Sequence, residues 1–307
     1  MSQNRNRWLD IAKGKGIAII LMVAGHTPIP SVMSHFIYAF HMPLFFISSG
    51  LVSNYEKYSL VDYIKHKSYT LLLPFVCYST IVAFLMYFIG ELDVIHYIKC
   101  GWGGYALWFI PILFMSSVLV RITFLIKRKY VRRFIMLCFL YIGYSLRHYE
   151  ISLPWSLSVL PYASFLVMLG KELADYKKRI ETPLSFYWDF YCLLSVTAVI
   201  SYLWKLDLAW NLITPIIPLT LGAVTGTLMV FRLSVWIRNA STMFSNIFTK
   251  VGRETYVVVA FSQVTVMCIN YLFTLNPLLK YAILVIVLIL LKYLKDGINR
   301  LVRIKIL

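Results

Sequence analysis

The chain alternates between long apolar blocks and short segments rich in lysine or arginine. A sliding window of about 19 residues finds apolar blocks close to the roughly 20 residues that a helix needs to cross a bilayer. They cover residues 16–31, 34–53, 69–90, 105–126, 134–146, 157–170, 186–204, 210–231, 254–273 and 276–291. Hydrocarbon offers no water to backbone groups, and the blocks lack the alternation of a barrel strand, so each is expected to be helical.

The predicted fold is therefore all-α, a polytopic membrane helical bundle of about ten transmembrane helices. The composition agrees, because 60% of the residues are hydrophobic and only 14% are charged, against about 25% charged in an average soluble domain. The sequence contains no repeat, linker or low-complexity tract. Residues 1–307 are expected to form a single integral-membrane domain with no appended soluble domain.

The formal net charge of +17 is explained by the position of the basic residues. Every second connecting segment is basic, so that 25 lysines and arginines fall on one side of the predicted bundle and 3 on the other. The positive-inside rule places the basic side, with both termini, in the cytoplasm. This accounts for the charge without a nucleic-acid partner. The basic segments are residues 1–15, 54–68, 127–133, 171–184, 232–253 and 292–307.

Ionisable residues inside a membrane are costly and therefore mark candidate sites. His26 lies about ten residues into the first predicted span, and Lys15 precedes it by eleven residues. Eleven residues make three helical turns plus about 20°, which puts both side chains on one face, roughly 16 Å apart along the axis. This spacing favours an anion-binding lysine at a cytoplasmic entrance and a base deeper inside. The alternatives are a buried neutral histidine and a snorkelling interfacial lysine.

The second predicted span holds two further histidines. His41 is expected inside the membrane, and His35 at the outer interface. Pro43 frees backbone groups that another group must satisfy. The run from Ser48 to Gly50 permits close helix approach, which is the packing interpretation of these small residues.

Three sequence blocks resemble those of a known family. Residues 7–16 read Arg-Trp-Leu-Asp-Ile-Ala-Lys-Gly-Lys-Gly and lead to His26, residues 40–46 read Phe-His-Met-Pro-Leu-Phe-Phe before Ser49-Gly50, and residues 107–111 read Leu-Trp-Phe-Ile-Pro. In this order they resemble the acyltransferase-3 superfamily, the integral-membrane O-acyltransferases that modify bacterial surface glycans. The resemblance covers essentially the whole chain.

The chain departs from the family pattern at three places. The first concerns the basic residue that precedes His26. The family's usual spacing from the aspartate selects Lys13 for this position, whereas helix geometry favours Lys15. The entry to the third span resembles an Arg-x-x-Arg-Leu-Leu-x-Pro pattern in which Lys67 keeps the first charge and Thr70 replaces the second. The late Gly-x-x-Ser block reads Gly-Arg-Glu-Thr at 252–255 and leads to Ser262 where many members have a histidine.

The resemblance implies transfer of an acyl group, most often acetyl, from cytoplasmic acyl-CoA to a sugar hydroxyl of a surface polysaccharide, lipopolysaccharide, capsule or lipid-linked glycan. It implies a multi-pass protein of the bacterial inner membrane that uses acetyl-CoA as donor and no metal. His26 is the expected catalytic residue, as general base or transient acyl carrier, and Lys15 and Lys67 are expected to bind the CoA phosphates. His41, Trp108 and His35 are the expected acceptor-binding residues; core packing is the alternative for Trp108.

Two other classes of membrane protein are also consistent with the sequence. A carrier or flippase for a lipid-linked glycan also needs a polar path through a helical bundle, although no internal symmetry of the kind frequent in transporters is visible. A structural or sensor membrane protein would tolerate replacement of His26 by Asn or Gln.

Overall fold

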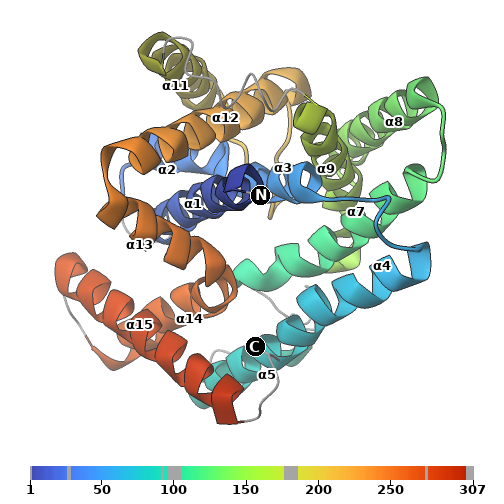
Figure 1. Cartoon of the computed structure of the whole chain (residues 1–307). Coiled ribbons are helices and arrows are strands. Elements are labelled where there is room, and N and C mark those ends of the chain that lie inside the picture. The colour runs from blue at the N-terminus through green and yellow to red at the C-terminus, as the bar shows by residue number, and fades with distance from the viewer. Residues whose placement is uncertain are drawn as a thin grey trace.

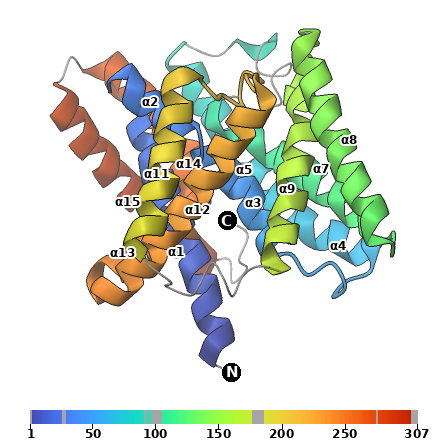
Figure 2. The same cartoon turned by 90° about the horizontal axis from the view of Figure 1, so that it is seen from above.

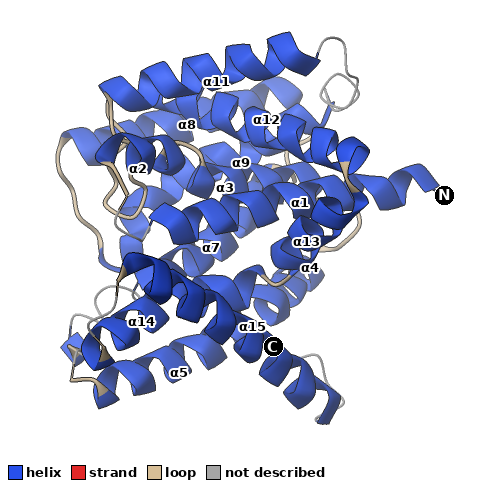
Figure 3. Cartoon of the chain, turned by 90° about the vertical axis from the view of Figure 1, so that its left-hand side faces the viewer, coloured by secondary structure: helices blue, strands red, loops and turns tan. Residues whose placement is uncertain are grey.

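The computed structural model describes residues 2–25, 29–90, 93–95, 105–175, 186–273 and 276–301. Within these ranges the regular secondary structure is helical, apart from one isolated bridge between Asp207 and Leu212 (Figures 1 and 3). The longer helices are α1 (Ser2–Gly25), α2 (Ser31–Tyr38), α3 (His41–Val52), α4 (Leu60–Lys67), α5 (Leu73–Phe88), α7 (Phe109–Thr123), α8 (Lys129–His148), α9 (Leu160–Asp175), α11 (Phe186–Leu203), α12 (Ile216–Ala240), α13 (Thr242–Arg253), α14 (Thr255–Leu272) and α15 (Pro277–Leu301). Short turns of other helix types lie at η1 (Ser68–Leu72), η2 (Tyr105–Trp108) and η3 (Pro154–Val159).

Six helical segments of the described chain are long and apolar enough to cross a membrane. They are Ser31–Val52, Leu60–Phe88, Ala106–Thr123, Pro154–Ala174, Ile216–Ala240 and Thr255–Leu272. The other four predicted spans coincide with α1, α8, α11 and α15, which carry more polar residues or are shorter where described. The all-helical prediction is confirmed, whereas the count of about ten spans stays a prediction.

Large apolar side chains cover much of the outer surface of the bundle. Phe84 on α5, Leu137 on α8, Tyr202 on α11 and Leu290 on α15 are each more than half exposed, as are many of their neighbours. A soluble protein rarely exposes apolar patches larger than a few hundred Å². Together with the six apolar helices, this surface identifies a multi-pass membrane protein.

Two segments predicted as connecting loops contain helices. In residues 54–68, Ser59 caps the start of α4 by accepting a hydrogen bond from the Asp62 backbone N–H. In residues 232–253, α12 extends to Ala240 and α13 follows. Both added helices carry basic residues that lower their local hydropathy, which is why the hydropathy window missed them.

The second predicted span is broken at Ala39 and Phe40, between α2 and α3. Pro43 has no N–H to give to the Ala39 carbonyl, so a regular helix cannot continue there. The Ala39 N–H donates to the His35 carbonyl at 3.0 Å, and the Phe40 N–H donates to the Ile37 carbonyl at 3.3 Å. The break gives α2 and α3 separate directions, as Figure 2 shows.

Two pairs of glycines bring helix backbones into direct contact. A Cβ atom on Gly16 of α1 would overlap the Phe248 carbonyl of α13, and one on Gly252 of α13 would overlap the Ala12 carbonyl of α1. Between α3 and α9, a Cβ on Gly50 or on Gly170 would overlap a carbonyl of the facing helix in the same way. Small residues at helix crossings allow this close approach in membranes.

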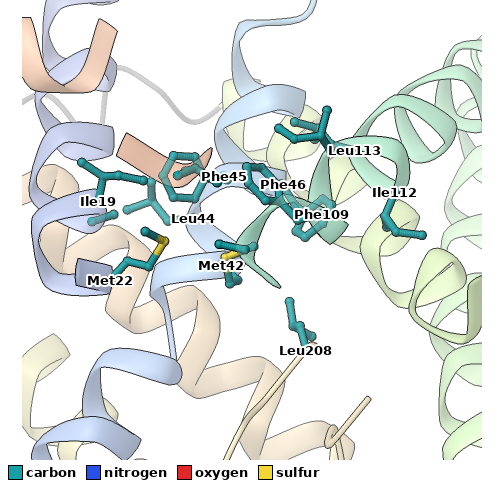
Figure 4. Packing of buried hydrophobic residues seen from close by; sticks show 14 of the residues in the cluster. Ile19, Met22, Met42, Leu44, Phe45, Phe46, Phe109, Ile112, Leu113 and Leu208 are labelled. Carbon is teal, nitrogen blue, oxygen red and sulfur yellow. The ribbon is translucent and has the colours of Figure 1, made fainter. Parts of the chain in front are cut away.

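The core between these helices is filled by aliphatic and aromatic side chains. Figure 4 shows one buried region that is lined by side chains of α1 (Ile19 and Met22), α3 (Met42, Leu44, Phe45 and Phe46) and α7 (Phe109, Ile112 and Leu113). The Phe45 and Phe109 ring centroids lie 5.8 Å apart. Helix α3 contacts α1, α9, α12 and α7, so it is the central element of the bundle.

Replacement of a crossing glycine is expected to destabilise the fold. Gly50→Ala and Gly252→Ala should each lower the free energy of unfolding by about 1–3 kcal/mol or more. This is the usual cost of overpacking, and the backbone carbonyls that the new Cβ would meet cannot move aside. Thermal unfolding in detergent and the amount of folded protein in membranes would measure this.

Gly297→Ala on α15 is the matched control, because a Cβ there would meet nothing within 4 Å. It should be neutral or stabilise by up to about 1 kcal/mol, the difference in helix propensity. Equal unfolding temperatures for all three variants would contradict the glycine contacts.

Candidate active site

Two lysines predicted to bind an anion lie near each other although they are 52 residues apart in the chain. Lys15 belongs to α1 and Lys67 ends α4, and both side chains are half-buried. Their ammonium groups are close enough to repel one another. Neither lysine forms an ion pair with a carboxylate in the described part of the chain. Partly buried like charges without a counter-ion favour an anionic ligand.

The alternative lysine of α1 has a different environment. The Lys13 side chain is only 2% exposed, whereas Lys15 is half-buried. Of the two, Lys15 is therefore better placed to meet a ligand from the aqueous phase, in agreement with the helix geometry.

Further polar residues lie beside Lys67. The Lys67 ammonium is 5.7 Å from the centroid of the Tyr63 ring, the Tyr63 and Tyr55 rings are 5.8 Å apart, and the Lys171 ammonium is 5.8 Å from the Tyr55 ring. The hydroxyls of Tyr55 and Tyr63 are buried within this group. Burial raises the pKa of Tyr55, so its phenol stays protonated and can donate.

Arg121 of α7 completes this group, which we term the cationic cluster: Lys15, Lys67, Arg121 and Lys171. Arg121 is 8% exposed, and one guanidinium nitrogen donates to the Tyr58 carbonyl at 3.0 Å, while Nε has no hydrogen-bond partner among the described residues. Lys171 donates to the Ser53 carbonyl at 3.0 Å. Sequence reasoning assigned Arg121 to a span without a role and counted Lys171 with a loop. An arginine inside an apolar block was the signal that could have found the first.

The predicted catalytic histidine, His26, lies outside the described residues. Helix α1 is described to Gly25, where a Cβ atom would be 3.4 Å from the Tyr38 ring of α2. Tyr38 therefore packs against the end of α1, next to the residue that precedes His26.

His41 occupies the break between α2 and α3. Its Nδ1 lies 3.0 Å from the Ile37 carbonyl oxygen. A carbonyl can only accept, so Nδ1 carries the proton, and this bond fixes the orientation of the ring. The Tyr38 ring meets the imidazole edge to face at 4.8 Å. His41 thus adds a second hydrogen bond to the Ile37 carbonyl at the helix break, and through Tyr38 it adjoins the end of α1.

The other two predicted acceptor residues are less distinctive. His35 is half-buried on α2, and no hydrogen bond or ring contact joins its imidazole to another described residue. Trp108 is 9% exposed at the junction of η2 and α7 and belongs to the hydrophobic core. Its burial favours the packing interpretation.

An acidic residue missed by sequence reasoning lies near Tyr38. Asp207, in the connection between α11 and α12, is 5% exposed. Burial raises its pKa, an effect opposed by Lys205, whose ammonium is 3.6 Å from the carboxylate. Lys205 also lies 5.9 Å from the Tyr38 ring. One aspartate in a short loop gave no recognisable sequence signal.

A comparison with protein families identifies the chain. The family model described as an acyltransferase domain, Acyl_transf_3, matches residues 6–295. The chain belongs to the acyltransferase-3 family. The family predicted from the three sequence blocks is thereby confirmed, and the protein is a membrane acyltransferase. Searches of curated proteins and of solved structures found no match.

All members of the cationic cluster lie within the region that matches the acyltransferase-3 family. So do His26, His41, His35 and Trp108. In the described part of the chain, no three His, Cys, Asp or Glu side chains gather as ligands of a metal ion would.

Removal of one charge from the cationic cluster should stabilise the ligand-free protein. Lys67→Gln is expected to raise the free energy of unfolding by about 1 kcal/mol, because it removes repulsion from Lys15 in a partly buried site. The gain in stability should shrink at high salt, because salt screens the repulsion between the two lysines where water reaches them. Thermal unfolding in detergent at low and high salt would measure both effects.

Lys65→Gln, an exposed lysine on the same helix, provides the control and should change stability little. A Lys67→Gln protein that is less stable than wild type at both salt concentrations would show that Lys67 is a structural residue instead.

Proposed function

We propose that this acyltransferase-3 protein moves an acyl group, most simply acetyl, from cytoplasmic acyl-CoA to a sugar hydroxyl of a surface polysaccharide or lipid-linked glycan. The proposal includes a single domain of ten spans in a bacterial inner membrane, with both termini in the cytoplasm. The observation that carries it is the cationic cluster, which lacks a described carboxylate partner at the basic end of an acyltransferase bundle.

The cationic cluster suits a phosphorylated donor. Lys15, Lys67, Arg121 and Lys171 all lie in or beside segments that the charge pattern assigns to the cytoplasm. CoA carries several phosphate charges at one end and its thioester at the other, joined by an uncharged arm. With the phosphates held by Lys15 and Lys67, the arm can extend along α1 and leave the charges at the membrane surface.

His26 is the residue proposed to act on the acceptor. As a general base, it takes the proton from the sugar hydroxyl while the oxygen attacks the thioester carbonyl, the C–S bond breaks, and the CoA thiolate receives the proton. As a nucleophile, its nitrogen takes the acyl group first and CoA leaves; the hydroxyl then attacks the acyl-imidazole. Only the second route releases CoA before an acceptor is added.

The remaining proposed contacts belong to the acceptor side. His41 keeps Nδ1 on the Ile37 carbonyl, so its Nε2 is the nitrogen that can meet a hydroxyl. His35 and Trp108 are proposed to line the same path. Their roles would be tested by the acceptor KM of the purified enzyme.

Loss of His26 is expected to abolish acylation. NMR of the purified surface polysaccharide should show O-acyl groups in cells with wild-type protein and none with His26→Ala or an empty vector. Equal amounts of protein in the membrane are required for the comparison. His66→Ala, which removes an exposed histidine of α4, is the matched control and should acylate as wild type does.

An O-acylation pattern that is the same with wild type and empty vector in several plausible hosts would contradict the enzyme proposal. A carrier or flippase would then become the leading hypothesis, because transport needs no acyl donor.

Lys15→Gln should act on the donor rather than on the chemistry. Loss of one phosphate contact is expected to raise the KM for acetyl-CoA about tenfold, or roughly 1.4 kcal/mol, with kcat nearly unchanged at saturating donor. Lys127→Gln, an exposed lysine after α7, is the control. An unchanged KM for the donor together with a raised KM for the acceptor would show that Lys15 contacts the acceptor and not the donor.

A further inference from the structure

A cavity of about 760 Å³ is lined by residues outside the cationic cluster. It is open on one side and is lined by the end of α8, the segment leading into η3, and a hairpin at residues 205–212 between α11 and α12. The volume falls within the range of roughly 300–1,000 Å³ typical of ligand pockets. The two connections carry only Arg147 and Lys205 as basic residues, so the positive-inside pattern assigns them to the outer side.

The backbone around this cavity is unusual. Every described residue other than glycine with a positive φ angle lines it: Glu150 at 54°, Trp155 at 60°, Ser156 at 55° and Asn211 at 53°. Such conformations cost energy for residues with a Cβ and concentrate at functional sites. The segment before η3 is held in shape by Ser158, whose hydroxyl accepts from the Leu153 N–H and donates to the Ile151 carbonyl.

The lining combines flat aromatic surface with hydrogen-bonding groups. Trp155 is 43% exposed and Trp210 is 75% exposed. Arg147 and Glu150 form no ion pair with another described residue, and the side-chain oxygen of Asn211 is buried without a hydrogen-bond partner. A buried unpaired oxygen in a cavity wall indicates a missing donor. Indole faces that pack against C–H groups, beside polar groups that bind hydroxyls, form the complement of a sugar.

The hairpin connects this cavity to the end of α1. Its backbone is closed by hydrogen bonds between Asp207 and Leu212 at 3.0 and 2.8 Å, and Leu208 is anchored in the core below Met42 (Figure 4). Lys205 and Asp207 face Tyr38, while Trp210 and Asn211 line the cavity. Tyr38 in turn packs on Gly25, the residue before His26.

We infer that this cavity binds a saccharide unit of the acceptor glycan on the outer side of the membrane, with Trp210 and Asn211 as specificity-determining contacts. The inference rests on the proposed acyl transfer and deepens it, because it names the place where the acceptor is selected. The tryptophans could also serve only as interfacial membrane anchors, and the test separates the two roles.

The experiment uses the full chain in nanodiscs and a de-O-acylated oligosaccharide prepared from the host's surface polysaccharide. Binding is measured without donor by saturation-transfer NMR and titration. Trp210→Ala is expected to weaken binding about tenfold through loss of an aromatic contact. Asn211→Gly keeps the left-handed backbone, which glycine adopts freely, and removes the amide; it should weaken binding about threefold or more. The acceptor KM should rise with the dissociation constant in both variants, and acetyl-CoA binding should stay unchanged.

Trp188→Ala is the matched control, because Trp188 is 80% exposed on α11 and does not line the cavity. Wild-type binding by both cavity variants would overturn the inference, and so would equal loss of binding in Trp188→Ala. Acyl transfer by a wild-type protein that binds no oligosaccharide would also overturn the inference while sustaining the proposed function. If the protein binds the oligosaccharide through Trp210 but transfers no acyl group, the saccharide-binding inference would hold and the proposed acyl transfer would be wrong.

Discussion

The arrangement of the bundle depends on two helix crossings at which glycines let the facing backbones touch. Inside a membrane, apolar surface gains nothing by leaving lipid for protein, so helices associate through close packing and polar contacts. The contact of α1 with α13 at Gly16 and Gly252, and that of α3 with α9 at Gly50 and Gly170, supply such packing. They fix the two helices that carry Lys15 and His41, and the site geometry follows from their positions.

The cationic cluster differs from the ion pairs found elsewhere in the described chain. Elsewhere in the described chain, half-buried Arg232 meets Asp189 and half-buried Lys295 meets Glu254. In the cationic cluster, Arg121 and Lys171 bind backbone carbonyls of the α3–α4 connection and have no acidic partner in the described part of the chain. The cluster therefore keeps an excess of positive charge that the fold itself does not neutralise, at a cost that an anionic substrate would offset.

Sequence reasoning found what hydropathy and motif spacing encode. Apolar block length located the helices. Pro43 indicated that backbone groups of the second span would lack their usual hydrogen bonds. The break at Ala39 and the hydrogen bond between His41 and the Ile37 carbonyl are seen only in the three-dimensional structure. Helix α13 was missed because Lys250 and Arg253 lower its hydropathy, while its partner on α1 is more than 200 residues away in sequence. Asp207 and the cavity beside Trp210 arise from contacts between separate loops, which no local pattern records.

The geometry of α1 also restricts the kind of donor that the proposed mechanism can use. Lys15 and Gly25 are ten residues apart on one helix, which is about 15 Å at 1.5 Å per residue. A donor whose charge lies next to its acyl group, such as an acyl phosphate, would have to carry that charge into the apolar core to reach the residues beyond Gly25. The free energy needed to bury an unpaired charge there is larger than the favourable interaction with one lysine at the surface. A donor with a long uncharged arm would avoid this cost, because its phosphates would stay beside Lys15 and Lys67 while its thioester extended to the end of α1.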